Sequence, residues 1–215
     1  MNIRKRELDL TILKLSNLDK KSVYYFYQNW RDEMNNPSIK IIVVSGKAQH
    51  GKDTTANLLY EELTNRGKRV LITHYGDLVK YICRSFFGWD GEKDITGRTL
   101  LQYVGTDVVR KERPDYWVEF ILDIINLFGD NWDYVIIPDT RFPNEINVLK
   151  SQYDNVTHIR VHRPGFDSGL TEEQLNHPSE IALDNTTPDI DIYNLGTIDG
   201  LREIVNFYIQ EGVFE

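Results

Sequence analysis

The sequence has few features of an exported or membrane-embedded protein. Cys83 is the single cysteine among 215 residues, so no disulfide can form within the chain. No apolar run is long enough for a membrane span, and no signal-like N-terminus appears. These absences predict a reducing, cytoplasmic setting. In such a setting we expect Cys83, which lies in an apolar helical stretch, to be a small buried hydrophobic residue.

An excess of basic residues is also missing. The chain has 33 acidic and 25 basic residues and a net charge of -8, which argues against a surface that binds nucleic acid or an anionic membrane. A small anionic substrate would need only a local cationic cluster. The chain has no internal repeat and no low-complexity segment, and its length suits one α/β domain better than two.

The most informative stretch covers residues 39–55. A β-branched apolar run ends at Gly46, four residues follow, and Gly51 and Lys52 open a predicted helix. Such a turn curls backbone N–H groups around an anion, and its lysine reaches the outer phosphates. The alternative is a strand-to-helix turn that binds no ligand. The predicted nucleotide-binding residues are Gly46, Lys47, His50, Gly51, Lys52, Asp53, Thr54 and Thr55.

Asp53 is the one departure from the usual phosphate-loop pattern. The pattern has Ser or Thr directly after the lysine, whereas this chain has Asp53 followed by Thr54. A carboxylate suits the first turn of a helix, yet it would repel a triphosphate unless it turns outward or reaches a magnesium ion. The residue that supplies the metal-binding hydroxyl is therefore left open.

The rest of the chain predicts an α/β fold with a parallel sheet and right-handed crossovers. Apolar runs predict strands that begin near residues 39, 69, 133, 156 and 189. Helical spacing predicts helices over residues 52–63, 76–87, 97–110 and 115–128 and from Thr197 onward. Residues 166–187 are polar and predict a mobile flap. In residues 1–38, we expect a strand over 7–15 and an aromatic-rich helix over 17–34 that docks on the domain; an interaction face is the alternative.

The predicted strand from residue 133 leads to Asp139 and Arg141. Ligands of open parallel sheets bind outside the carboxyl ends of the strands, and Asp139 lies at such an end. A carboxylate there could orient hydrated magnesium beside the phosphate loop. The alternative is an aspartate that caps the following helix.

Cationic side chains recur near predicted helix starts, strand ends and loops. Phosphoryl transfer needs positioned positive charge, because negative charge spreads over the oxygens of the moving group. Each cation could instead be a solvated surface residue, and this alternative is strongest for Arg84 and Arg110. The candidates are Lys80, Arg84, Arg98, Arg110, Arg141 and Arg163.

Four stretches together resemble the phage-type deoxynucleoside monophosphate kinases. They are residues 46–56, residues 101–107 with 115–118, residues 135–141 and residues 161–165, and they occur in that family's order. The resemblance covers about residues 39–210. Residues 1–38 look like an extension packed on a kinase domain over 39–215.

The resemblance implies a three-layer P-loop kinase fold with a five-stranded parallel sheet in the order 2-3-1-4-5 and a mobile lid. It also implies transfer of the γ-phosphoryl group of ATP, with Mg²⁺, to a (deoxy)nucleoside monophosphate. A phage-encoded protein would act in the host cytoplasm, and a homodimer is left open. The implied catalytic residues are Lys52, Asp139, Arg141 and Arg163, and the implied metal residues are Thr54 and Asp139. The residues implied to bind the acceptor are Lys80, Arg98, Gln102, Asp107 and Arg141. His177, Ser179 and Glu180 fall in the flap.

Two other functions remain open from the sequence. A kinase of another phosphorylated small molecule, such as phosphomevalonate or dephospho-coenzyme A, would share the loop and the strand end. A nucleotide-binding module without catalysis would keep the loop but would need no acceptor cations. The pair Lys80 and Arg98 favours an acceptor phosphate, and therefore an enzyme.

Overall fold

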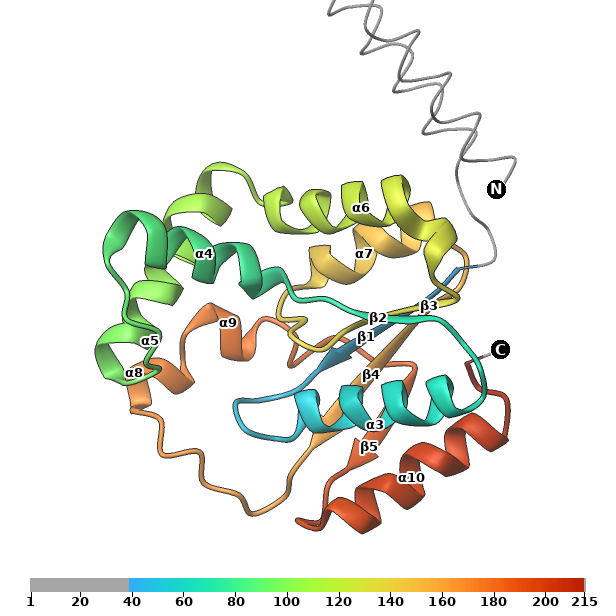
Figure 1. Cartoon of the computed structure of the whole chain (residues 1–215). Helices are drawn as coiled ribbons and strands as arrows, with labels where there is room; N and C mark the ends of the chain where they lie inside the picture. The colour runs from blue at the N-terminus through green and yellow to red at the C-terminus, as the bar shows by residue number, and fades with distance from the viewer. Residues whose placement is uncertain (1–38, 215) are drawn as a thin grey trace, which may run out of the picture. The chain divides into compact units, whose positions relative to one another are not determined.

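The computed structural model describes residues 39–214. Its centre is a five-stranded parallel sheet in the order β2-β3-β1-β4-β5 (Figure 1), which confirms the predicted fold class and strand order. The strands are β1 (Lys40–Ser45), β2 (Val70–Ile72), β3 (Tyr134–Ile137), β4 (Val156–His162) and β5 (Ile190–Tyr193).

The central strand β1 is buried on both faces because its residues are almost all apolar and β-branched. Ile41 and Val43 point to one face and contribute to one core cluster. Ile42 and Val44 point to the other face and contribute to a second cluster. Two separate cores require helices on both sides of the sheet.

The helices form the two outer layers (Figure 1). Helices α3 (Lys52–Asn65) and α10 (Ile198–Gln210) cover one face, and α4 (Tyr75–Phe87), α6 (Tyr116–Phe128) and α7 (Pro143–Gln152) cover the other. Shorter elements are α5 (Ile95–Gln102), the π-helix η1 (Tyr103–Arg110), the 3₁₀ turn η2 (Gly129–Asn131), α8 (Glu172–Leu175) and α9 (Pro178–Ile181). The phosphate loop, α5, α8 and α9 gather at the carboxyl end of the sheet.

Two sequence predictions need correction, and the predicted flap shows local structure. The strand predicted from residue 69 to 75 ends at Ile72, because His74 and Tyr75 start helix α4. The helix predicted over 97–110 begins at Ile95 and becomes a π-helix at Tyr103. The flap contains two short helices, α8 and α9, each with a polar residue that caps its first turn.

Other predictions concern burial and the N-terminal segment. Cys83 is fully buried, as predicted, and burial raises the pKa of its thiol. Within residues 39–214, no helix has both the length and the apolar character needed to cross a membrane. The strand and helix predicted before residue 38, and their packing on the domain, lie outside the described residues.

Candidate active site

Two glycines shape the loop between β1 and α3. Gly46 has φ +142°, and a Cβ there would lie 2.4 Å from the carbonyl oxygen of Val161. Gly51 has φ +103°, and a Cβ there would lie 2.6 Å from Nδ2 of Asn194. Both positions therefore require glycine, for the backbone conformation and for the space.

The side chain of Lys52 points toward the backbone of the phosphate loop. Lys52 Nζ donates to the carbonyl oxygens of Gly46 at 2.9 Å and Lys47 at 2.8 Å. Burial, assisted by the nearby positive charge of Arg141, lowers the pKa of Lys52 to about 7. Incoming phosphate oxygens would replace the two carbonyls and restore the ammonium charge.

The outer side of the loop is held by the ends of β4 and β5. The backbone N–H of Arg163 donates to Nδ1 of His50 at 3.2 Å, and Asn194 Nδ2 donates to the carbonyl oxygen of His50 at 3.0 Å. Burial lowers the pKa of His50, which favours the neutral ring that accepts this bond. Asn194 is a loop-supporting residue that the sequence reasoning did not identify, since its contact is made across 144 positions.

The side chain of Asp53 contacts a histidine that precedes α4. Its Oδ1 lies 3.4 Å from Nε2 of His74, the residue that precedes α4. His74 was not among the predicted site residues. Its position just after β2, at the carboxyl edge of the sheet, was the available signal.

Asp139 anchors a helix start. Its Oδ1 accepts the backbone N–H of Tyr75 at 3.0 Å, and its Oδ2 accepts that of Gly76 at 2.8 Å. It therefore caps α4 rather than the helix that follows it in sequence. The carboxylate is fixed at the edge of the phosphate loop and still has unused lone pairs.

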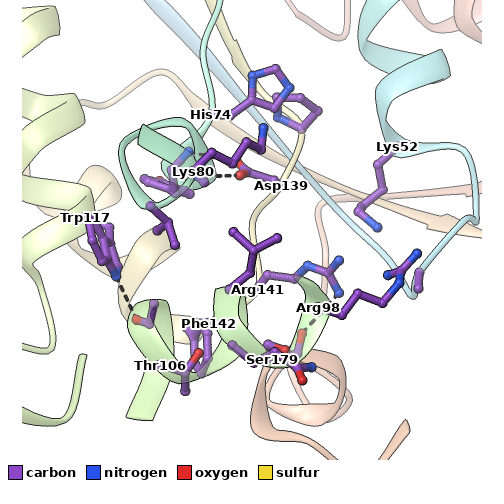
Figure 2. Close-up of a pocket in the computed structure, with 18 of the residues that line it drawn as sticks. Lys52, His74, Lys80, Arg98, Thr106, Trp117, Asp139, Arg141, Phe142 and Ser179 are labelled. Carbon is purple, nitrogen blue, oxygen red and sulfur yellow. Dashed lines mark hydrogen bonds between the residues drawn. The ribbon is translucent and has the colours of Figure 1, made fainter. Parts of the chain in front are cut away.

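A cavity of about 400 Å³ opens beside the phosphate loop. Figure 2 shows Lys52 on one side of it and Trp117 on the opposite side, with Arg98 and Arg141 between them. The wall includes seven of the predicted site residues and the candidate cation Arg110, together with the unpredicted residues His74 and Lys93. The seven are Lys52, Asp53, Lys80, Arg98, Gln102, Asp139 and Arg141.

The far end of this cavity is less polar. Val79, Gly105, Thr106, Trp117 and Phe142 contribute to it. Trp117 Nε1 donates to the carbonyl oxygen of Gly105 at 2.9 Å, and a Cβ on Gly105 would lie 3.4 Å from Val79. Gly105 therefore lies against Val79 at ordinary van der Waals distance.

Arg110 is held by a carboxylate in the cavity wall. Its Nη2 donates to Glu145 Oε1 at 2.6 Å, and the side chains are 12% and 2% exposed. Its guanidinium also stacks on Phe142, 3.9 Å from the ring centre. Burial raises the pKa of Glu145, and Arg110 opposes that rise. The alternative that Arg110 is a solvated surface residue is wrong, and Arg110 is already paired.

A second cavity of about 220 Å³ lies on the other side of the phosphate loop. Gly46, Lys47 and His50 contribute to its wall, as does Arg160 from β4. Arg141 and Ser179 line both cavities. The guanidinium group of Arg141, beside Lys52, therefore lies in a wall that the two spaces share.

The flap is docked on the phosphate loop. Glu180 pairs with Arg141 through Oε1, and its Oε2 accepts the backbone N–H of Ala48 at 3.0 Å. Lys47 Nζ donates to the carbonyl oxygen of Glu180 at 2.7 Å and pairs with Asp184 at 2.5 Å. A flap carboxylate thus occupies groups that a phosphate could use.

Other predicted residues lie elsewhere. Of residues 39–214, the following candidates line neither cavity: Gly51, Thr54, Thr55, Arg84, Asp107 and Arg163. Thr55 Oγ1 is committed to the Gly51 carbonyl at 2.9 Å. Arg163 stacks on Phe166, and its Nη1 donates to the carbonyl oxygen of Gln49 in the phosphate loop at 3.3 Å. Asp107 faces His177 at 3.9 Å. Within the same range, no group of three or more His, Cys, Asp or Glu side chains is placed to hold a metal ion.

Comparison with known proteins gives one family. The model of the deoxynucleotide monophosphate kinase family matches residues 74–205. The deoxynucleotide monophosphate kinase of Enterobacteria phage T4 is 36% identical over 106 residues, which is 48% of this chain and 41% of the phage protein. The aligned region therefore spans about two-fifths of that relative's length.

Two further similarities are broader and weaker. A protein of Acanthamoeba polyphaga mimivirus is 27% identical over 186 residues, which cover 74% of this chain and 90% of that protein. Among solved structures, the APS kinase CysC of Mycobacterium tuberculosis in complex with AMPPNP and APS has a TM-score of 0.47 and 11% identity, and the match covers 81% of this chain and 99% of that one.

Proposed function

The chain belongs to the deoxynucleotide monophosphate kinase family, and from this premise we propose that it transfers the γ-phosphoryl group of ATP to a deoxynucleoside monophosphate. The observation that carries the proposal is that two cavities share Arg141 in their walls, beside the phosphate-loop lysine. Phosphoryl transfer needs two phosphate-bearing substrates held end to end with positive charge between them.

The donor belongs on the phosphate loop. Lys52 would exchange its two carbonyl partners for the outer phosphates, and the loop N–H groups would bind the remaining oxygens. The second cavity, which borders the loop at Gly46, Lys47 and His50, extends this site under the flap.

The acceptor belongs in the larger cavity. Lys80 and Arg98 supply cations for its phosphate, and Gln102 and Thr106 offer hydrogen-bonding groups near the apolar end, where a base would pack against Trp117 and Phe142. An acceptor phosphate is largely ionised near neutral pH, so its oxygen can attack the γ-phosphorus without a general base. The bond from that phosphorus to ADP then breaks, and Arg141 would stabilise the charge on the moving group.

Magnesium would arrive with the nucleotide. Mg²⁺ is usually bound by one or two carboxylates, water and substrate phosphates, so a preformed protein cluster is not required. Asp139, fixed by two backbone N–H groups at the loop edge, fits a role beside the hydrated ion, where the metal would neutralise phosphate charge. Thr54 stays the candidate hydroxyl ligand from sequence, although it lines neither cavity.

The test is a product assay with ATP and a panel of acceptors. The panel contains deoxynucleoside monophosphates, ribonucleoside monophosphates, phosphomevalonate and dephospho-coenzyme A, and both ADP and the phosphorylated product are measured. We expect product with deoxynucleoside monophosphates and none with phosphomevalonate or dephospho-coenzyme A. Lys52→Ala should lower the rate about a hundred- to a thousandfold, whereas Lys68→Ala, at an exposed turn after α3, should not. Turnover of another acceptor, or ATP binding without product, would overturn the proposal.

A further inference from the structure

The phosphate loop carries a negative charge at a position where a nucleotide would not favour one. Asp53 directly follows Lys52, lies in the first turn of α3 and lines the larger cavity. Its side chain is 76% exposed, so burial does not suppress its charge. A carboxylate there would repel the phosphates of a bound nucleotide unless a cation balances it.

His74 is placed to supply that balance. Its Nε2 lies 3.4 Å from Asp53 Oδ1, and its Nδ1 lies 3.3 Å from Asp77 Oδ2. Both ring nitrogens therefore face carboxylates. A neutral imidazole has one N–H, whereas an imidazolium has two and can donate to both partners.

The surroundings of His74 support the charged form. The hydrogen bond that His74 donates to Asp53 is the largest cause that raises the pKa of His74; Asp139 and Asp77 add to it, and burial and Lys80 oppose it. The same contact lowers the pKa of Asp53. These carboxylates come from α3, from α4 and from the loop after β3. Together they surround one imidazole ring and favour its positive charge.

The imidazole ring of His74 also connects α3, which follows the ATP-binding loop, with α4, which contributes to the acceptor cavity. Asp53 belongs to the helix that follows the phosphate loop, and Asp77 belongs to the first turn of α4. Asp77 in turn pairs with Lys80 at 2.8 Å, and Lys80 lines the acceptor cavity. One short chain of charges, Asp53–His74–Asp77–Lys80, thus runs from the donor loop to the acceptor wall. Figure 2 shows His74 above Lys80 and Asp139 at this wall.

We propose that His74 is a positioning residue that holds Asp53 by hydrogen bonding and balances its charge, so that this phosphate loop accepts a nucleotide although an aspartate follows its lysine. The inference rests on the proposed function in that the loop binds ATP. The carboxylate of Asp53 then does not prevent nucleotide binding, because His74, 21 positions away, neutralises its charge.

The test is a double-mutant cycle on ATP affinity, measured by calorimetry with the full chain and Mg²⁺. His74→Ala should weaken ATP binding by about threefold to a hundredfold, the range that Coulomb's law gives for two unit charges about 6 Å apart between the dielectric constant of water and that near a protein surface. The same substitution in an Asp53→Asn background should change ATP affinity by less than about twofold. Arg202→Ala, which removes a different cross-element ion pair to α3, is the matched control and should leave affinity unchanged.

The outcomes separate the two proposals. A wild type that binds no ATP would overturn the proposed function together with this inference. A wild type that binds ATP, combined with an unaffected His74→Ala variant, would overturn this inference alone. An equal loss in both backgrounds would overturn it too, since His74 would then contact the nucleotide directly. If His74→Ala does not fold, Asp53→Asn alone decides: affinity within about twofold of wild type supports the balance, and a gain of about tenfold overturns it.

Discussion

Two arginines in the same cavity wall have different surroundings, and this difference predicts different roles. Arg98 lies on α5 and donates through Nε to the backbone carbonyl of Lys93 at 3.0 Å. Arg110 pairs with the buried carboxylate of Glu145. Because Arg98 binds a neutral carbonyl, its positive charge is available to a ligand. The positive charge of Arg110 is largely offset by the carboxylate of Glu145.

Alanine substitutions should separate these roles. Arg98→Ala should raise the Michaelis constant for the monophosphate on the order of tenfold or more, with little change for ATP and in stability, because a charge-assisted phosphate contact is lost. Arg110→Ala should instead lower the free energy of unfolding by about 3 kcal/mol, because it leaves Glu145 buried without its charged partner. Urea denaturation and steady-state kinetics of both variants measure this. Equal Michaelis constant changes for both substrates in Arg98→Ala would contradict the assignment.

The lowered pKa of Lys52 predicts a proton taken up on binding. With a pKa of about 7, a large fraction of Lys52 is neutral at pH 8 in the free protein. Phosphate oxygens favour the charged ammonium and raise the pKa, so binding at pH 8 should take up a proton, and affinity should fall as the pH rises above about 7. The heat of ATP binding should therefore depend on the ionisation enthalpy of the buffer.

The matched variant for this measurement is Lys52→Arg. A guanidinium is charged at every pH in the experiment, so its binding heat should not depend on the buffer. If the variant binds ATP with the same proton uptake as the wild type, the proton belongs to another group, such as His50 or His74.

At the scale of elements, the flap is held by charges rather than by apolar contacts. Glu180 binds Arg141 and the N–H of Ala48, and Lys47 binds Asp184. Few of its residues are buried, so replacing these charges should release it. The prediction of a mobile flap stays a prediction, and the docked arrangement indicates which contacts would control the motion.

Glu180→Gln tests that control. It removes the charge that pairs with Arg141 and occupies the Ala48 N–H, so amide hydrogen exchange over residues 172–184 should become faster in the free protein. ATP should bind more tightly, because it no longer competes with a carboxylate for these groups. Glu173→Gln, an exposed position on α8, is the control. Unchanged exchange in Glu180→Gln would show that the pairs do not hold the flap.

The elements differ in how well the sequence predicted them. The parallel strands were predictable because they are buried on both faces and read as continuous apolar runs. The phosphate loop was predictable because it is local, with glycine spacing, lysine and helix start within seven residues. The π-helix at Tyr103–Arg110 was not, because its apolar spacing matches an ordinary helix; its distinctive contact, from Trp117 to the Gly105 carbonyl, comes from another element.

The same distinction applies to the site. Lys80, Arg98 and Gln102 lie in one cavity wall, because each lies at a helix position near the sheet edge, and their roles stay predictions. The pairing of Glu180 with Arg141 spans 39 positions, and that of His74 with Asp53 spans 21. Such contacts are set by the packing of helices on the sheet, and no local sequence pattern specifies them.

At the scale of the whole chain, an acidic protein concentrates positive charge at one place. The net charge is -8, yet Lys52, Lys80, Arg98 and Arg141 line the larger cavity. A site of this kind favours small anions that fit inside it, while the acidic surface disfavours long polyanions. This arrangement fits the proposed pair of nucleotide substrates.

The geometry of two cavities that share Arg141 predicts how the molecule responds to a ligand that fills both. An adenosine joined to a deoxynucleoside through a chain of phosphates should bind about a hundredfold or more tightly than ATP, because the second cavity is then filled without a second loss of translational freedom. The same compound should raise the melting temperature beyond ATP plus deoxynucleoside monophosphate at equal concentrations. Adenosine tetraphosphate, which lacks the second nucleoside, is the matched ligand control. Arg141→Ala should reduce this advantage most strongly, since the linking phosphates would cross its guanidinium. If the linked compound binds no more tightly than adenosine tetraphosphate, the two cavities do not form one continuous transfer site.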